Sequence, residues 1–266
     1  MTIFEVNILG INFAPSYYGL MYVIGFLTGF YIIKKRGRII AAKSKKVKNS
    51  DLLDDLFLYI FLGVILGGRL GYVLFYNLSS YISNPLDIIK VWEGGMSFHG
   101  GVIGVILAMR VFSNKYKTSF LKLADQVTLV LPIGLGLGRI GNYLNNELLG
   151  YSGYEGLFAV YINGTGYFPS PLLEALLEGL VLFIILNIIY HFNTIKKAIL
   201  GFDGQIATLF LIIYAFFRIF VEVFFRTPDS HIGYILGYFT VGELLTIPML
   251  IGGLYIYWRL KLIKNT

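Results

Sequence analysis

The chain has 266 residues, of which 56% are hydrophobic and only 14% are charged, with a mean hydropathy of +0.72. An ordinary soluble domain carries about 25% charged residues, so this composition excludes a soluble globular protein and indicates a membrane protein. The formal net charge of +7 does not indicate nucleic-acid binding, because the basic residues crowd short loops beside apolar runs.

Apolar runs long enough to cross a membrane follow one another along the whole chain. A hydrocarbon layer about 30 Å thick requires roughly 20 apolar residues per spanning helix. The sequence therefore predicts an all-α integral membrane protein in which residues 1–266 form a single domain of seven transmembrane helices. The predicted helices cover residues 17–33, 53–76, 97–112, 121–140, 172–190, 205–224 and 238–258. The N-terminus lacks the basic region and cleavage site of a signal peptide, so we expect the first helix to be retained.

Basic residues predict which loops are cytoplasmic. Eight Lys and Arg residues follow the first predicted helix, four lie near the turn between the third and fourth, two follow the fifth, and three lie at the C-terminus. All of them fall on one side if the N-terminus is outside and the C-terminus is cytoplasmic. The glycine-rich and aromatic loops then form an elaborated outer, periplasmic-side region, which comprises residues 77–96, 141–171 and 227–237.

Ionisable residues lie inside the predicted helices at the depth of the outer leaflet. Arg69, Arg139 and Arg218 occupy the later parts of the second, fourth and sixth helices, which run outward. The helices that run inward begin with polar residues at the same depth, namely Tyr18, His99, Glu174 and Glu243. A charge in hydrocarbon costs at least ~2.5 to 3.5 kcal/mol, so we expect these groups to share one cavity that binds an anionic lipid. Each arginine taken alone could instead snorkel to the interface or pair with a buried glutamate.

Several sequence blocks carry a resemblance to a known family. Residues 138–150 read GRIGNYLNNELLG, and shorter blocks are YGLMY at 18–22, GGRLGY at 67–72, EGGMSFHGG at 93–101, RIFVE at 218–222 and TIPM at 246–249. The first block resembles the signature G-R-x-G-N-F-x-N-x-E-x-x-G of the prolipoprotein diacylglyceryl transferase family, with Tyr143 in place of Phe. The resemblance covers nearly the whole chain in order and is weakest over residues 151–167.

This resemblance implies a membrane transferase. Its reaction would move the sn-1,2-diacylglyceryl group of phosphatidylglycerol to the lipobox cysteine thiol of a prolipoprotein signal peptide, forming a thioether and releasing glycerol 1-phosphate. That reaction is the first step of bacterial lipoprotein maturation. The resemblance also implies a multi-pass protein of the bacterial cytoplasmic (inner) membrane with its active site facing the outer leaflet. We expect no cofactor and no metal, because the sequence has no cysteine and only three scattered histidines.

The chemistry implied by the resemblance suggests roles for named residues. His99 is the candidate base for the thiol, because imidazole titrates near neutral pH; alternatively, arginines lower the thiol pKa and His99 only positions the lipid. Arg139 and Arg218 are the candidate catalytic clamp on the phosphate, since guanidinium stays charged and binds phosphate bidentately. The candidate substrate-binding residues are Tyr18, Arg69, Asn142, Asn145, Glu147, Gly150, Glu174 and Glu222. Purely structural readings remain open for the loop residues 142–147, as a cap, and for Tyr18, as part of an interfacial aromatic belt.

Three departures from the family pattern leave roles open. The family segment H-P-S-Q-L-Y-E reads FPSPLLE here over residues 168–174, with Phe168, Pro171 and Leu173 in place of His, Gln and Tyr. The spacing from Glu222 to Arg226 is one residue longer than in the family's E-F-F-R. Glu243 stands where the family has Gln.

Two other classes of function compete with the transferase. Charged cavities between helices also mark transport paths, so the chain could be a transporter or flippase of an anionic lipid. Transport would require polar residues through both leaflets, whereas the predicted inner halves are apolar apart from Asp125. A lipid-binding scaffold would need no base.

Overall fold

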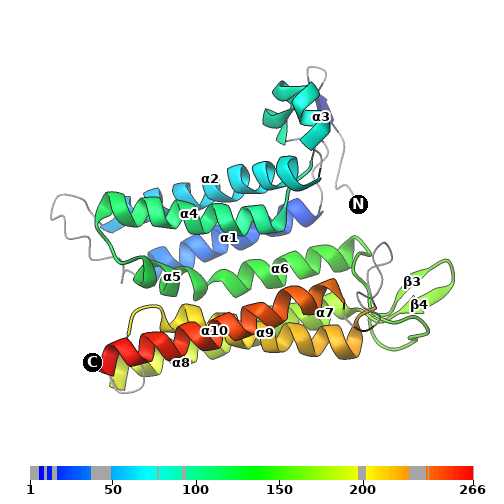
Figure 1. Cartoon of the computed structure of the whole chain (residues 1–266). Coiled ribbons are helices and arrows are strands. Elements are labelled where there is room, and N and C mark those ends of the chain that lie inside the picture. The colour runs from blue at the N-terminus through cyan, green and yellow to red at the C-terminus, as the bar shows by residue number, and fades with distance from the viewer. Residues whose placement is uncertain are drawn as a thin grey trace. The chain divides into compact units, whose positions relative to one another are not determined.

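The structure is a computed structural model that describes residues 6–8, 11–13, 17–36, 49–76, 78–91, 94–196, 202–227, 238 and 240–265. Helices make up most of the described chain, and two short β-hairpins complete it (Figure 1). The chain falls into two compact units. The first comprises Met1–Ile33 and Asp125–Thr266, and the second comprises Lys34–Ala124. The prediction of one domain over residues 1–266 stays a prediction.

Helices occupy every segment that the apolar runs predict. The long elements are α1 (Tyr17–Arg36), α2 (Asn49–Tyr76), α4 (Phe98–Tyr116), α5 (Phe120–Thr128), α6 (Leu131–Leu144), α8 (Leu182–Lys196), α9 (Gln205–Phe225) and α10 (Val241–Asn265). The short elements are α3 (Leu78–Ser83), η1 (Pro85–Ile89), α7 (Ser170–Glu174) and η3 (Ala175–Val181). Two antiparallel hairpins pair β1 (Val6–Ile8) with β2 (Ile11–Phe13), and β3 (Val160–Ile162) with β4 (Thr165–Tyr167).

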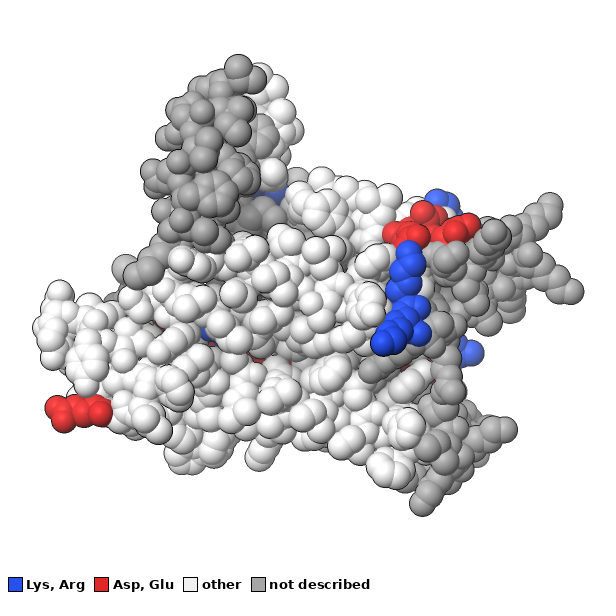
Figure 2. All heavy atoms as spheres, turned by 180° about the vertical axis from the view of Figure 1, so that it is seen from behind, with Lys and Arg blue, Asp and Glu red and all other residues white. Residues whose placement is uncertain are grey.

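Several of these helices suit a membrane. Within the described residues, Asp51–Phe75, Ser170–Phe192 and Gln205–Phe225 are long and apolar enough to cross one, and α5 with α6 would make a fourth, bent span. Figure 2 shows a face covered largely by uncharged residues, with few Lys, Arg, Asp and Glu side chains in view. Exposed apolar helix surfaces of this kind suit contact with lipid. The structure thus supports a helical membrane protein, while the seven spans and their orientation stay predictions.

The fourth predicted helix, residues 121–140, is broken in the structure. Its two halves, α5 and α6, meet at an angle of 44° across residues 129–130. Pro132 lies in the first turn of α6. A proline there has no N–H to donate to the preceding turn, and its ring clashes with a continuing α-helix, so the run cannot remain straight.

The first unit packs through glycines and a leucine-rich core. A Cβ atom added to Gly179 of η3 would lie 2.7 Å from the Cα of Gly136 in α6, so only glycines allow the two backbones to approach this closely. Beside this contact, η3 is wound as a π-helix. The buried core residues are Leu129, Leu182, Leu186, Ile206 and Phe210. Contacts of this kind hold the helices that carry the charged residues described below.

Asp125, the carboxylate that the sequence predicts in the inner half, has a structural role in the first unit. Its two oxygens accept hydrogen bonds from the backbone N–H groups of Gly204, at 2.7 Å, and Ala207, at 2.9 Å. Gly204 is the N-cap residue of α9. Because the first N–H groups of a helix have no partner within the helix, Asp125 satisfies two donors that would otherwise be unpaired.

The second unit is built on a glycine seam between α2 and α4. Gly63, Gly67 and Gly71 recur at intervals of four on α2 and face Gly100 and Gly104 of α4. Side chains at these positions would overlap the opposing backbone, so the seam requires residues without a Cβ. Small residues spaced in this way are typical of close helix packing in membranes.

Candidate active site

Arg69 organises the chain segment that leads to α4 in the second unit. Arg69 is only 4% exposed, and the Cζ atom of its guanidinium lies over the ring of Tyr81, 5.2 Å from the ring centroid. The guanidinium donates hydrogen bonds to the backbone carbonyls of Asp87, Ile88, Gly94 and Gly95. The bonds to Asp87 and Ile88 measure 2.6 and 2.8 Å. In this structure the Arg69 guanidinium binds backbone carbonyls of the protein itself. Its predicted binding of substrate stays a prediction.

The segment that Arg69 binds leads directly into the start of α4, where His99 lies. His99 is the second residue of α4 and its side chain is exposed. Ser97 caps this helix, because its Oγ accepts a hydrogen bond from the N–H of Gly100 at 3.2 Å. The N–H of Ser97 in turn donates to the carbonyl of Gly68 at 2.8 Å. Since Gly68 adjoins Arg69, α2 determines where α4 and its histidine begin.

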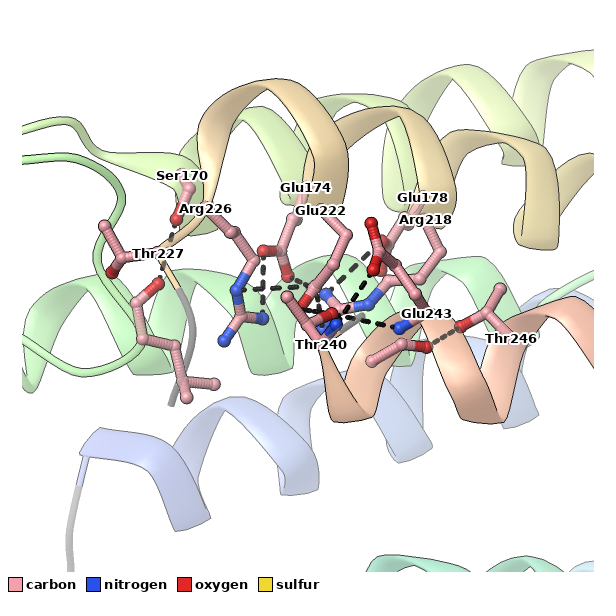
Figure 3. A network of polar contacts seen from close by, with 12 residues as sticks. Ser170, Glu174, Glu178, Arg218, Glu222, Arg226, Thr227, Thr240, Glu243 and Thr246 are labelled. Atoms are coloured by element: carbon pink, nitrogen blue, oxygen red, sulfur yellow. Dashed lines mark hydrogen bonds and ion pairs between the residues drawn. The ribbon is translucent and has the colours of Figure 1, made fainter. Parts of the chain in front are cut away.

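The first unit contains six charged residues in mutual contact, three buried glutamates and three partly buried arginines, which we call the charge cluster (Figure 3). They come from α6, α7, η3 and α9, and from the residue after α9. The members are Arg139, Glu174, Glu178, Arg218, Glu222 and Arg226. Three guanidinium groups face three carboxyl groups, so the formal charges cancel when all six are ionised.

Glu174 is the centre of the charge cluster. Its carboxylate is completely buried, and Oε2 lies 2.7 Å from both Arg139 Nε and Arg218 Nη1. The other oxygen, Oε1, lies 3.4 Å from Arg226 Nη1. An unpaired charge would be costly at this position, so Glu174 and the arginines depend on one another. The alternative in which each arginine pairs with a buried glutamate therefore describes this cluster, and the shared Glu174 oxygen brings two guanidinium groups close together.

Arg226, whose role the sequence left open, belongs to the cluster. Arg218 Nη2 lies 3.1 Å and Arg226 Nε lies 3.6 Å from the same oxygen of Glu222, and each pair is spaced by four residues. The N–H of Arg226 bonds to the carbonyl of Val221, five residues back. This wide closing turn accommodates the longer spacing and returns Arg226 to the side of Glu222.

Glu243 caps α10 instead of joining the cluster. Its Oε2 accepts from the N–H of Thr240 at 2.8 Å, while Thr240 Oγ1 accepts from the N–H of Glu243 at 3.1 Å. These reciprocal bonds form a capping box. Thr240 Oγ1 also donates to Glu222 Oε1 at 2.9 Å, so the cap is linked to the charge cluster through Glu222.

The end of α6 and the following turn hold the polar residues of the long motif. The side-chain amides of Asn142 and Asn145 donate to the two oxygens of Glu147, at 3.1 and 3.3 Å. Gly150 donates its N–H to the carbonyl of Phe168 at 2.8 Å, and a Cβ there would overlap the carbonyl of Phe225. These contacts match the structural reading of the loop, and the predicted contact of these residues with substrate stays a prediction.

The departure at residue 168 has a packing explanation. The ring of Phe168 contacts three aromatic rings, with centroid distances of 5.2 Å to Tyr151, 5.0 Å to Tyr154 and 5.2 Å to Phe225. Such pairs add about 0.5–1.5 kcal/mol each beyond the burial of apolar area. The phenyl ring, which stands where the family pattern has a histidine, thus joins the loop before α7 to the end of α9.

The structure brings together four of the predicted site residues, Arg139, Glu174, Arg218 and Glu222. It adds Glu178, which the sequence reasoning missed although a carboxylate inside an apolar run is itself a signal of function. His99 and Arg69 belong to the other unit. Tyr18 is the second residue of α1, and its side chain lies outside the described part of the chain. A single cavity shared by all of these groups stays a prediction.

Comparison with known proteins decides the family. A sequence model described as prolipoprotein diacylglyceryl transferase matches residues 6–259. The chain belongs to the prolipoprotein diacylglyceryl transferase family. Proteins named phosphatidylglycerol--prolipoprotein diacylglyceryl transferase are 44% identical over 261 residues in Rickettsia felis and 47% identical over 244 residues in Rickettsia canadensis. These alignments cover 96% and 91% of this chain, and 97% and 90% of the relatives. Membership in the family makes the chain a transferase of lipoprotein biosynthesis.

Proposed function

We propose that this chain transfers the diacylglyceryl group of phosphatidylglycerol to the lipobox cysteine of a prolipoprotein signal peptide. The observation that supports this most directly is the partly buried pair of guanidinium groups, Arg139 and Arg218, which meet at one oxygen of Glu174. Paired guanidinium groups suit a phosphate that gains charge as it leaves. The names of the relatives supply the donor and the acceptor.

The proposed reaction is a displacement at carbon. The cysteine sulfur bonds to the glyceryl carbon that carries the phosphate, and the bond between that carbon and its ester oxygen breaks. Diacylglyceryl thioether and glycerol 1-phosphate result. The thiol proton passes to a base, for which we propose His99, because a thiol with a pKa of about 8.5 is mostly protonated at neutral pH. Arg139 and Arg218 stabilise the negative charge on the departing phosphate.

We place the reaction at the outer leaflet of the bacterial cytoplasmic membrane, with seven spans, an outer N-terminus and a cytoplasmic C-terminus. The distribution of Lys and Arg over the loops supports this orientation. The transporter alternative has less support, because Asp125, the acidic residue expected in the inner half, is engaged in capping α9.

The decisive experiment supplies purified protein with phosphatidylglycerol and a synthetic lipobox peptide, followed by mass spectrometry of the peptide. We expect a mass increase corresponding to one diacylglyceryl group on cysteine and an equal amount of glycerol phosphate. Phosphatidylethanolamine in place of phosphatidylglycerol, and a peptide with serine instead of cysteine, serve as controls. Folded protein that leaves the cysteine peptide unmodified would refute the proposal.

A further inference from the structure

The Glu178 carboxylate lies against the arginine pair without being firmly bound by it. Both of its oxygens are buried and accept no hydrogen bond from any described residue. The nearest cationic atoms are Arg139 Nη2, at 3.5 Å, and Arg218 Nη1, at 3.7 Å. A buried carboxylate with such loose partners is not adequately compensated for the loss of water.

Glu174 lies beside the same two arginines as Glu178 but contacts them much more closely. Its Oε2 lies 2.7 Å from each guanidinium, about 1 Å closer than the oxygens of Glu178. One carboxylate therefore anchors Arg139 and Arg218, and a second one adds negative charge without anchoring them. Figure 3 shows Glu174, Glu178 and Arg218 directed toward one another from separate elements.

The effect of the Glu178 carboxylate follows from the balance of charges in the charge cluster. The three arginines of the charge cluster are neutralised only when Glu174, Glu178 and Glu222 are all ionised. The Arg139 and Arg218 side chains retain 17% and 11% exposure, whereas Glu178 has none. An anion must therefore approach the guanidinium groups from their exposed side, while Glu178 attracts them from the buried side and repels the anion.

We infer that Glu178 is a positioning residue that weakens the hold of Arg139 and Arg218 on a phosphate, so that the phosphate product can leave. This inference rests on the proposed function, because it assigns the arginine pair to the substrate phosphate. A phosphodiester carries one negative charge, and the released glycerol phosphate carries up to two. Without an opposing carboxylate, the same two guanidinium groups would hold the product more tightly than the donor.

Binding of phosphates to protein in neutral detergent tests the inference without any turnover. The ligands are inorganic phosphate, glycerol phosphate and phosphatidylglycerol, titrated calorimetrically into the unaltered protein and into Glu178→Gln. We expect roughly tenfold tighter binding of glycerol phosphate by the variant, which corresponds to about 1.4 kcal/mol. If Glu178→Gln also binds inorganic phosphate more tightly, Glu178 opposes the phosphate group alone. If only glycerol phosphate and phosphatidylglycerol bind more tightly, Glu178 opposes the whole glycerol phosphate headgroup. Equal or weaker binding of all three ligands overturns the inference.

Turnover supplies a second readout. In Glu178→Gln we expect a lower KM for phosphatidylglycerol together with a lower kcat and stronger inhibition by added glycerol phosphate. A residue with only a structural role would lower kcat without tightening any phosphate. Since the binding measurement does not need the acceptor peptide, a failure of the transferase proposal and a failure of this inference give different results.

Two further variants guard against misinterpretation. Glu155→Gln removes one negative charge from an exposed position of the outer loop and should leave phosphate binding unchanged. Glu178→Asp keeps the charge but draws it back from the arginines, and we expect an intermediate tightening. If Glu178→Gln does not fold by circular dichroism, the aspartate variant decides: binding no tighter than in the unaltered protein rejects the inference.

Discussion

Arg139 and Arg218, carried by α6 and α9, each place a guanidinium nitrogen 2.7 Å from the same atom, Glu174 Oε2. This relationship joins two helices that are far apart in sequence through a third, and it brings two positive groups close together. A buried carboxylate can fix guanidinium groups in place, so little reorganisation is needed when charge develops on a bound phosphate.

Removal of one arginine should abolish most of the activity. We expect Arg139→Ala to lower kcat by roughly 100- to 1,000-fold, the range for loss of a single charge-stabilising donor. The measurement is the rate of peptide diacylglycerylation by mass spectrometry. Arg110→Ala, which removes an exposed arginine of α4, is the matched control and should keep its activity. A comparable rate in Arg139→Ala would remove the arginine pair from the mechanism.

The base role of His99 predicts a characteristic pH response. Loss of a general base lowers rates by about 10²- to 10⁴-fold, and we expect such a loss at pH 7 for His99→Gln. The residual rate should rise with pH toward the ordinary thiol pKa of about 8.5, because thiolate then forms without a base. His191→Gln, at an exposed histidine of α8, is the control. Full activity of His99→Gln at neutral pH would favour a thiol activated by the arginines.

Arg69 should act on the backbone segment that it binds. Lysine keeps the positive charge but lacks the fork of donors that reaches four carbonyls. We expect Arg69→Lys to speed hydrogen exchange over the described residues of 85–97 and to lower kcat, with the KM for phosphatidylglycerol nearly unchanged. Unaltered exchange combined with a raised KM would instead place Arg69 on the substrate.

Substitutions at Glu243 test whether its negative charge or only its hydrogen bond to Thr240 matters for the cap of α10. Gln serves in a capping box as Glu does, so Glu243→Gln should retain both thermal stability and activity. Glu243→Ala removes the bond to Thr240 and should lower stability by about 1 kcal/mol. Thermal unfolding in one detergent compares the two variants. Inactivation of the glutamine variant would show that the negative charge itself is needed.

Gly150, which follows the turn after α6, has no room for a side chain, so its substitution should destabilise the protein. A methyl group there would overlap the carbonyl of Phe225, and overpacking of this kind costs about 1–3 kcal/mol. We expect Gly150→Ala to unfold at a lower temperature. Gly252→Ala is the control, because a Cβ added to Gly252 has no neighbour within 4 Å among the described residues. Equal melting temperatures would contradict the packing argument.

Much of the charge cluster could be predicted because buried charges are expensive and therefore informative. That reasoning identified Arg139, Arg218 and Glu174, and the family resemblance added Glu222; all four lie within predicted apolar helices. Glu178, one turn beyond Glu174, was not predicted, because it does not lie at the beginning of a predicted helix as Glu174 does. The role of Arg226 stayed open, since a linear motif cannot show that a wide closing turn absorbs one extra residue.

The helices were predictable from their apolar runs, whereas their irregularities were not. An apolar run predicts that a segment is helical but not whether it is straight, and the bend between α5 and α6 depends on Pro132 and on local packing. The use of Arg69 was likewise unpredictable. The motifs GRLG and GRIG are nearly identical, yet one arginine binds backbone carbonyls and the other binds carboxylates, because the partners come from distant segments.

The π-helical winding of η3 has a consequence for insertions and deletions in this region. An α-helix advances about 100° per residue, and a π-helical turn holds one residue more than an α-helical turn. Because the π-helical turn already absorbs that extra residue, deletion of one residue between Ala175 and Val181 would restore α-helical winding and leave the following residues nearly in phase. Insertion of one residue would instead rotate the leucines at 182 and 186 by about 100° relative to Glu174, so this segment should tolerate a deletion better than an insertion.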